Sequence, residues 1–120
     1  MRIVLPSPPS DVEITASTLE PLPPVVTSDV LEQRCRAHLR GEVERVGPAN
    51  TALGWPCFVL RSRCADSYVV RAYICFLDHG VLVEARANDA DACDRAWSVV
   101  AQARPDWSGD LVALGQLFSA

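Results

Sequence analysis

The residues whose types and spacing best suit chemistry are Cys75, Asp78 and His79, which lie close together in the sequence. A thiol beside an imidazole and a carboxylate is the combination that nucleophilic catalysis uses, because the base accepts the proton of the thiol. No signature of a known cysteine enzyme surrounds these residues, and the chain has no glycine-rich phosphate loop. We therefore assign no catalytic residue. A small enzyme or metal-dependent factor centred on these three residues is the alternative hypothesis.

A zinc site would combine Cys35 and His38, which share a helical face, with Cys75 and His79 at the end of a long strand. Zinc needs three or four nitrogen or sulfur ligands that converge tetrahedrally. The chain has five cysteines, but no Cys-x-x-Cys pair, the spacing of zinc knuckles and redox motifs. We expect buried apolar cysteines, no metal and no cofactor. A disulfide between Cys57 and Cys75, expected to be neighbours on adjacent strands, is disfavoured in a reducing compartment.

The composition is that of a single globular domain. The chain of 120 residues has room for one core, and 49% of the residues are hydrophobic while 22% are charged. No apolar run approaches the ~20 residues that cross a bilayer, and the N-terminus lacks a signal-peptide core. We therefore expect a cytoplasmic protein with no membrane insertion. The net charge of −4 argues against nucleic acid as a partner, because proteins that bind it usually carry a basic excess.

The stretch 55–87 predicts three antiparallel strands, at 55–63, 67–77 and 81–87. The evidence for these strands is that apolar and other residues alternate with period 2 in the middle strand, a pattern typical of a sheet with one buried face. The turns Cys64-Ala65-Asp66 and Asp78-His79-Gly80 carry residues that tight turns use. The residues expected on the buried face are Val70, Ala72, Ile74 and Phe76, and those expected on the other face are Arg71, Tyr73 and Cys75.

Two helices complete an α+β domain, at about 29–40 and 89–104. Both carry apolar stripes at helical spacing, so we expect them to pack on one face of the antiparallel sheet. Further strands are expected at 2–5, 12–16 and 42–46, with a turn at 47–51. The C-terminal tail 108–120 is apolar at Leu111, Leu114, Leu117 and Phe118, and we expect it to form a short helix that is docked on the body or binds a partner.

This order of elements resembles the Mog1/PsbP-like group, which includes small bacterial DcrB-related domains. The matching pieces are Gly54-Trp55-Pro56 before the first long strand, the strands 68–76 and 81–85, and the helix 92–103. The likeness covers roughly residues 11–107. It implies a non-enzymatic protein-binding module that acts as an adaptor, an accessory subunit or a secretion chaperone. The group has no shared motif, so the resemblance assigns no functional residue.

The outward face of the three strands is the binding surface that the sequence favours, together with the tail. Arginine and tyrosine are enriched where proteins bind each other, although cross-strand Arg–Glu pairs on a solvated sheet are the plain alternative. We expect a protein partner or a second copy of the chain in a homodimer. The candidate partner-binding residues are Arg61, Arg63, Arg71, Tyr73, Leu82, Glu84, Arg86, Leu114, Leu117 and Phe118.

Overall fold

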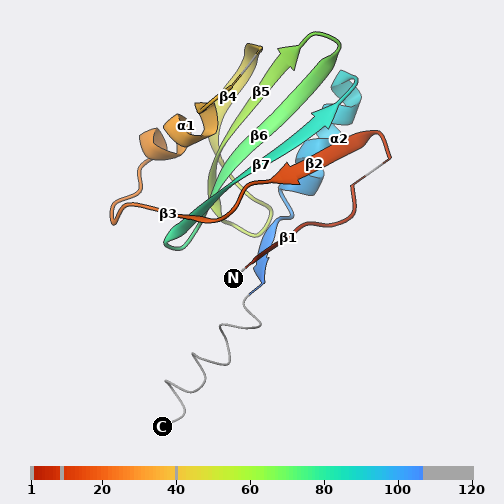
Figure 1. Ribbon diagram of the computed structural model, residues 1–120. Helices are drawn as coiled ribbons and strands as arrows, with labels where there is room; N and C mark the ends of the chain where they lie inside the picture. The colour runs from red at the N-terminus through yellow and green to blue at the C-terminus, as the bar shows by residue number, and fades with distance from the viewer. Residues whose placement is uncertain (1, 9, 40, 107–120) are drawn as a thin grey trace.

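An antiparallel sheet with one helix on each side forms the body of the protein (Figure 1). The computed structural model describes residues 2–8, 10–39 and 41–106. Within these residues the main sheet has six strands in the order β2-β7-β6-β5-β4, with β3 also paired to β7, and β1 pairs separately with β8. The predicted α+β class is therefore confirmed. The elements are β1 Arg2–Val4, β2 Val12–Ala16, β3 Glu20–Pro21, α1 Ser28–Arg36, β4 Glu42–Asn50, β5 Pro56–Cys64, β6 Ser67–Phe76, β7 His79–Ala87, α2 Ala90–Val100 and β8 Arg104–Asp106.

The predicted meander is present as β5, β6 and β7, which pair in sequence order. Two-residue turns at 65–66 and 77–78 join the strands. Tight hairpin turns need left-handed backbone, and Ala65 (φ 51°) and Leu77 (φ 59°) supply it. The second turn lies one residue earlier than we predicted, so residues 79 and 80 belong to β7.

The register of the first hairpin differs by one residue from our prediction. Cys57 lies opposite Ile74 instead of Cys75, and Arg61 lies opposite Val70. Directly opposite residues share a face, so a one-residue shift moves every side chain of the partner strand to the other face. The cause is the length of the turn, which holds two residues where we expected three. Cys57 and Cys75 therefore lie on opposite faces, and both are free thiols.

The two helices pack on opposite faces of the sheet, which corrects the prediction that they share one face. α1 contacts β5 and β6, whereas α2 contacts β7, β6 and β2. Figure 1 shows α1 in front of the sheet and α2 behind it. The reason lies in β6, whose residues 69–76 are all buried, on both faces. A strand that is buried on both faces needs a cover on each side.

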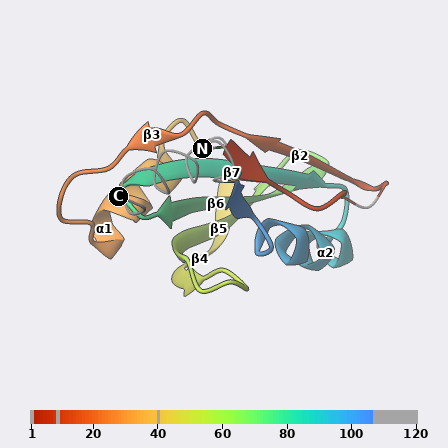
Figure 2. The same cartoon turned by 90° about the horizontal axis from the view of Figure 1, so that it is seen from below.

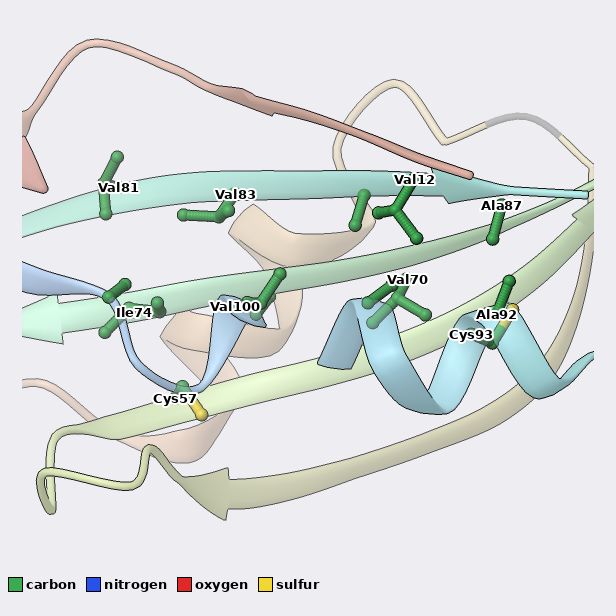
Figure 3. Packing of buried hydrophobic residues seen from close by; sticks show 14 of the residues in the cluster. Val12, Cys57, Val70, Ile74, Val81, Val83, Ala87, Ala92, Cys93 and Val100 are labelled. Atoms are coloured by element: carbon green, nitrogen blue, oxygen red, sulfur yellow. The ribbon is translucent and has the colours of Figure 1, made fainter. Parts of the chain in front are cut away.

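The core on the α2 side is almost entirely aliphatic. Val70, Ala72, Ile74 and Phe76 project from β6 toward α2, as the alternation predicted, and all are buried. Figure 3 shows side chains of this cluster between the strands and α2. The helix contributes Ala92, Cys93, Ala96 and Val100.

Both helices end earlier than we predicted. α1 begins after Thr27, whose hydroxyl accepts the Val30 amide at 3.4 Å, and it ends before His38, which has φ 57°. α2 begins after Asp89, whose carboxylate accepts the Ala92 amide at 2.7 Å. Residues expected in its last turn instead form a turn and then β8, which pairs with β1.

β4 is longer than predicted, because the expected turn at 47–51 is largely strand. β4 lies at the edge of the sheet, and a proline is tolerated there since its missing amide faces outward. Pro48 pairs with Phe58 in this strand, and the register shifts at a bulge between Val43 and Arg45. The proline-rich connector also carries β3, where we expected no strand.

The C-terminal tail 108–120, with its candidate residues Leu114, Leu117 and Phe118, lies outside the described residues. In the part of the chain that is described, neither helix has the length and apolar character needed to span a bilayer.

Candidate functional site

The face of the sheet that we expected to be open is closed by α1. Tyr73 is 2% exposed and Arg71 is 8% exposed, although both were predicted to face solvent. The apolar side chains Leu31 and Cys35 of α1 pack over them together with Leu60. Residues expected on a wet surface are therefore part of a second core. The prediction of an open face is wrong at Arg71 and Tyr73.

Tyr73 lies at the centre of a polar cluster that joins three elements. Its hydroxyl donates to the carboxylate of Glu20 in β3, and Arg34 of α1 lies 2.7 Å from the same carboxylate. Arg34 also donates to the Tyr73 oxygen at 3.3 Å. The hydrogen bond from Tyr73, together with Arg34, lowers the pKa of Glu20, while burial and the nearby Glu20 raise the pKa of Tyr73. The cluster holds α1 and β3 against β6.

Gly80 makes room for the ring of Tyr73. A Cβ added at Gly80 would lie 2.6 Å from the Tyr73 ring carbon Cζ, closer than real Cβ contacts. The glycine that we interpreted as a turn residue is thus a strand residue on which an aromatic ring packs.

Arg71 holds the C-terminal end of α1. Its Nη1 donates to the carbonyl oxygens of Cys35 at 3.2 Å and Ala37 at 2.7 Å, which are helix-end acceptors without helical partners. Its Nε and Nη2 donate to Glu84 at 3.1 and 2.9 Å. The hydrogen bonds of this guanidinium thus join it to the end of α1 and to Glu84 of β7. Of the other candidates on this face, Leu82 is half-buried, while Arg86 is exposed and lies 3.9 Å from Glu84.

The structure does not assemble Cys75, Asp78 and His79 into a catalytic group. The Cys75 thiol is buried and donates to the carbonyl oxygen of Leu77 at 3.3 Å. His79 Nδ1 lies 2.8 Å from the carboxylate of Asp78 on an exposed turn. Burial raises the pKa of Cys75, which disfavours the thiolate that a nucleophile needs.

The proposed zinc ligands are likewise separate. Cys35 is fully buried on the side of α1 that faces the sheet, and its thiol donates to the carbonyl oxygens of Phe58 and Arg71 at 3.3 and 3.5 Å. Burial raises the pKa of this thiol to about 11. His38 is exposed after the end of α1. Among residues 2–8, 10–39 and 41–106, no three His, Cys, Asp or Glu side chains are placed to hold one metal ion.

The opposite face carries a groove that the sequence did not reveal. It has a volume of about 400 Å³ and lies between α2 and the edge strand β4. α2 packs on β7, β6 and β2, so it leaves β4 and part of β5 uncovered. A helix is about 10 Å wide, the width of about two strands, so one helix cannot cover this sheet. The groove is lined by Val46, Gly47, Pro48, Ala49, Val59, Arg61, Val70, Cys93, Asp94 and Trp97.

Small residues on β4 produce the hollow. Gly47 lies opposite Val59 and Ala49 lies opposite Cys57, so both face the α2 side of the sheet. A Cβ added at Gly47 would meet no atom within 4 Å, so the position borders open space. A glycine and an alanine on the part of β4 that faces the α2 side leave open the volume of the groove, which larger side chains at these positions would fill.

Arg61 provides a charged group at the groove. Its guanidinium lies 5.0 Å from the ring centre of Tyr68, and its Nε lies 3.3 Å from the Glu44 carboxylate. This distance marks an ion pair, but the buried Nε has no hydrogen-bond partner in the described chain. Arg63 is exposed and also packs on Tyr68, at 5.8 Å.

The predicted patch is therefore divided between two surfaces. Arg61 and Arg63 lie on the α2 face, while the other candidates of the meander lie on the α1 face. Trp97 is half-buried and lines the groove. The sequence feature that could have indicated the groove is the strand alternation of β4, which continues through Gly47 and Ala49. Pro48 between them favoured a turn instead.

The chain matches no protein-family model, no curated protein and no solved structure. The resemblance to the Mog1/PsbP-like group therefore stays a prediction.

Proposed function

We propose that the protein is a small, non-enzymatic binding module that holds an apolar segment of a protein partner in the groove between α2 and β4. The observation that carries the proposal is the groove itself, a hollow of about 400 Å³ with predominantly apolar walls. Ligand sites of this size and lining are typical of proteins that bind through apolar contacts with a few polar groups. Arg61, whose buried Nε donates no hydrogen bond within the described chain, supplies a polar contact that would orient the occupant.

The closed α1 face also favours the groove, rather than the face of Arg71 and Tyr73, as the binding surface. Tyr73 and Arg71 are engaged with Glu20, Arg34, Glu84 and helix-end carbonyls, so a partner could reach them only by displacing α1. The groove offers uncovered sheet without such displacement.

A role as an adaptor, accessory subunit or secretion chaperone is the narrower form of this proposal, and a homodimer is the form in which the partner is a second copy. We place the protein in the cytoplasm. The free, buried cysteines at 35, 57, 75 and 93 support a reducing compartment.

Photo-crosslinking in the cells that produce the protein tests the proposal. A photoreactive amino acid replaces Asp94, an exposed α2 residue that lines the groove, and in the control it replaces Gln33, an exposed α1 residue on the opposite face. We expect a covalent adduct with one distinct polypeptide from position 94 and none from position 33. Identical products from both positions, or no adduct from position 94, would show that the groove is not a partner site.

A graded series at Gly47 makes the test specific. Gly47→Phe would fill the groove without a backbone clash, because nothing lies within 4 Å of its Cβ position, whereas Gly47→Ala leaves most of the volume open. We expect Gly47→Phe to reduce the adduct about tenfold or more, the effect of losing ~1.4 kcal/mol of contact, and Gly47→Ala to keep it. Equal adduct yields from both folded variants would contradict the proposal.

A further inference from the structure

We propose that the groove between α2 and β4 selects a partner segment that forms an amphipathic helix with arginine or lysine beside its apolar side chains. This inference rests on the proposed function for the identity of the site, and adds the chemistry of the segment that the site accepts. Three features of the groove support it: the irregular edge of β4, the negative charge along α2 and the aromatic ring of Trp97.

The edge of β4 is poorly suited to a partner that adds as a strand. Strand addition needs a row of free backbone amides, and Pro48 lacks one in the middle of β4. The bulge between Val43 and Arg45 interrupts the same strand further along. A helix needs none of these backbone groups, since its own amides are already paired. The edge of β4 therefore favours a helical partner segment.

The uncovered part of the sheet is about as wide as one helix. Figure 2 shows α2 (blue) to one side of β4 (yellow), and α2 packs on β7, β6 and β2 instead. Two neighbouring strands span about 10 Å, which is close to the diameter of a helix. A helix of the partner would thus lie beside α2, with one row of its side chains directed into the hollow at Gly47.

The walls of the groove carry an uncompensated negative charge. Asp94 of α2 is exposed and lines the groove, and none of the described side chains forms an ion pair with it. On the sheet side of the groove, Arg61 lies 3.3 Å from the carboxylate of Glu44, so these two charges offset each other. Burial raises the pKa of the Cys93 thiol, which lines the same groove, and all three charges also act on it. The three charges therefore surround one hollow, in which Asp94 is left without a counter-charge.

The neighbouring surface of α2 has the same sign. Asp91 is exposed and lies three residues before Asp94, so both carboxylates project from the same side of the helix. Arg95, the one basic residue in the α2 sequence, forms an ion pair with Asp11 just before β2, at the other edge of the sheet. The net charge of −4 on the whole chain also favours encounter with a basic partner. A segment that carries arginine or lysine therefore complements this surface, whereas an acidic segment is repelled.

Trp97 supplies an aromatic surface for the stem of a basic side chain. It lies three residues after Asp94, so the indole and the carboxylate share one side of α2, and it is half-buried in the groove wall. Arginine and lysine pack their aliphatic stems on apolar surface, and their cationic ends bind over indole rings. A basic residue of the partner can thus pack on Trp97 and reach Asp94, while its apolar neighbours fill the hollow beside Gly47.

The hollow and Asp94 contribute differently to recognition. Apolar side chains buried beside Gly47 supply most of the affinity, whereas an ion pair at the rim adds a smaller part that depends on the sign of the charge. Replacement of Asp94 should therefore weaken the binding of a basic segment without abolishing it, so position 94 still serves for crosslinking. Lysine at this position should reverse the charge that the groove prefers.

Peptide selection on the purified full-length protein tests the inference. A displayed library of random linear peptides is selected on the parent, and peptides that also bind Gly47→Phe are discarded, because that variant has a filled groove. We expect the remaining peptides to carry apolar residues three and four positions apart, with arginine or lysine next to them on the helix. Selection on Asp94→Lys should give the same apolar spacing with aspartate or glutamate in place of the basic residue.

The affinity of one selected peptide, measured by fluorescence anisotropy, gives the size of the effect. We expect Asp94→Asn to weaken binding about fivefold, the effect of losing an ion pair at the rim of an interface, and Asp94→Lys to weaken it further. Glu13→Gln is the matched control, because it removes the same charge from an exposed position of β2 at the other edge of the sheet, and it should leave the affinity unchanged. Circular dichroism checks that each variant is folded.

The other outcomes separate the inference from the proposed function. Groove-dependent peptides would overturn the inference and leave the proposed function standing if they lack a basic preference, if their apolar residues alternate as in a strand, or if Asp94→Lys selects the same sequences. Equal weakening by Asp94→Asn and Glu13→Gln would also overturn it, since the attraction would then be to the whole acidic protein. If no peptide requires the open groove, the proposed function and the inference both fail.

Discussion

The two faces of β6 are stabilised by different interactions. Toward α2 the strand presents Val70, Ala72, Ile74 and Phe76, which are buried among other apolar side chains. Toward α1 it presents Arg71 and Tyr73, whose polar atoms are directed at specific partners.

One face of β6 mainly contributes stability, and the other mainly fixes the position of a helix. Apolar burial is non-directional and scales with area, so the α2 face supplies stability without fixing one orientation of the helix. Hydrogen bonds are directional, and a buried group left without its partner is costly. The α1 face therefore determines where α1 lies and keeps that face closed, while the α2 face supplies most of the core and leaves a groove at its edge.

The largest effect is expected from Ile74→Ala on the α2 face. Ile74 is fully buried, so the substitution removes apolar contacts and leaves a cavity, and we expect a loss of about 4 kcal/mol in the free energy of unfolding. Urea denaturation followed by circular dichroism measures the loss. Val25→Ala, at a residue that is 73% exposed, should change stability by less than about 0.5 kcal/mol. Equal losses in the two variants would contradict the assigned core.

A smaller loss is expected from Arg71→Leu on the α1 face. The substitution leaves the carbonyl oxygen of Ala37 without this donor and Glu84 without its buried partner, and we expect a loss of about 3 kcal/mol. Arg86→Leu is the control, because this arginine points from the same face into solvent and should cost little. Adding Glu84→Leu to Arg71→Leu should recover part of the loss, since the uncompensated charge is then removed.

This result would also decide how Arg71 is to be understood. If Arg71→Leu and Arg86→Leu have the same free energy of unfolding, the hydrogen bonds from Arg71 to α1 do not stabilise the fold. That result would favour the interpretation of Arg71 as a partner-binding residue.

The smallest effect concerns Glu20 and appears only in acid. The hydrogen bond from Tyr73, and Arg34 beside it, lower the pKa of Glu20 in the folded protein, so the ionised carboxylate stabilises the fold above the ordinary glutamate value of 4.5. This contribution is lost as the pH falls below 4.5 through the lowered pKa. Because the Glu20 side chain is 48% exposed, solvent screening limits it to less than about 1 kcal/mol.

The variant Glu20→Gln should unfold with a weaker pH dependence between about pH 5 and pH 3 than the parent, in thermal melts recorded across that range. Glu13→Gln, at an exposed position of β2, changes the net charge equally and serves as the control. If both variants shift the melting profile in the same way, the Glu20–Tyr73–Arg34 cluster does not tie β3 to the sheet.

Much of the fold could be predicted because its signals are local. The alternation of Val70, Ala72, Ile74 and Phe76 identifies a strand and its buried side without reference to the rest of the chain. Acidic residues before α2 mark its start in the same way, and Asp89 is the observed cap. The α+β class follows from the order of these elements.

The candidate site could not be predicted, because it depends on relations between elements. A turn of two residues instead of three moved Arg61 and Arg63 to the face opposite Arg71 and Tyr73. The sequence offers no local signal that Arg71 is buried, since its partners are main-chain carbonyls at the end of α1. The groove exists because α2 lies over β6 and β7 rather than over β4.

Local patterns in the sequence were enough to locate the strands β5, β6 and β7, the two helices and the apolar side of β6, since periodicity and caps act over a few neighbouring residues. The side of the sheet that each helix covers, the arginines that share a face and the part of the sheet left uncovered all follow from how the elements pack in three dimensions. Register and helix placement are set by turn length and by contacts between residues far apart in the chain. A shift of one residue there exchanges the faces while leaving every local pattern unchanged.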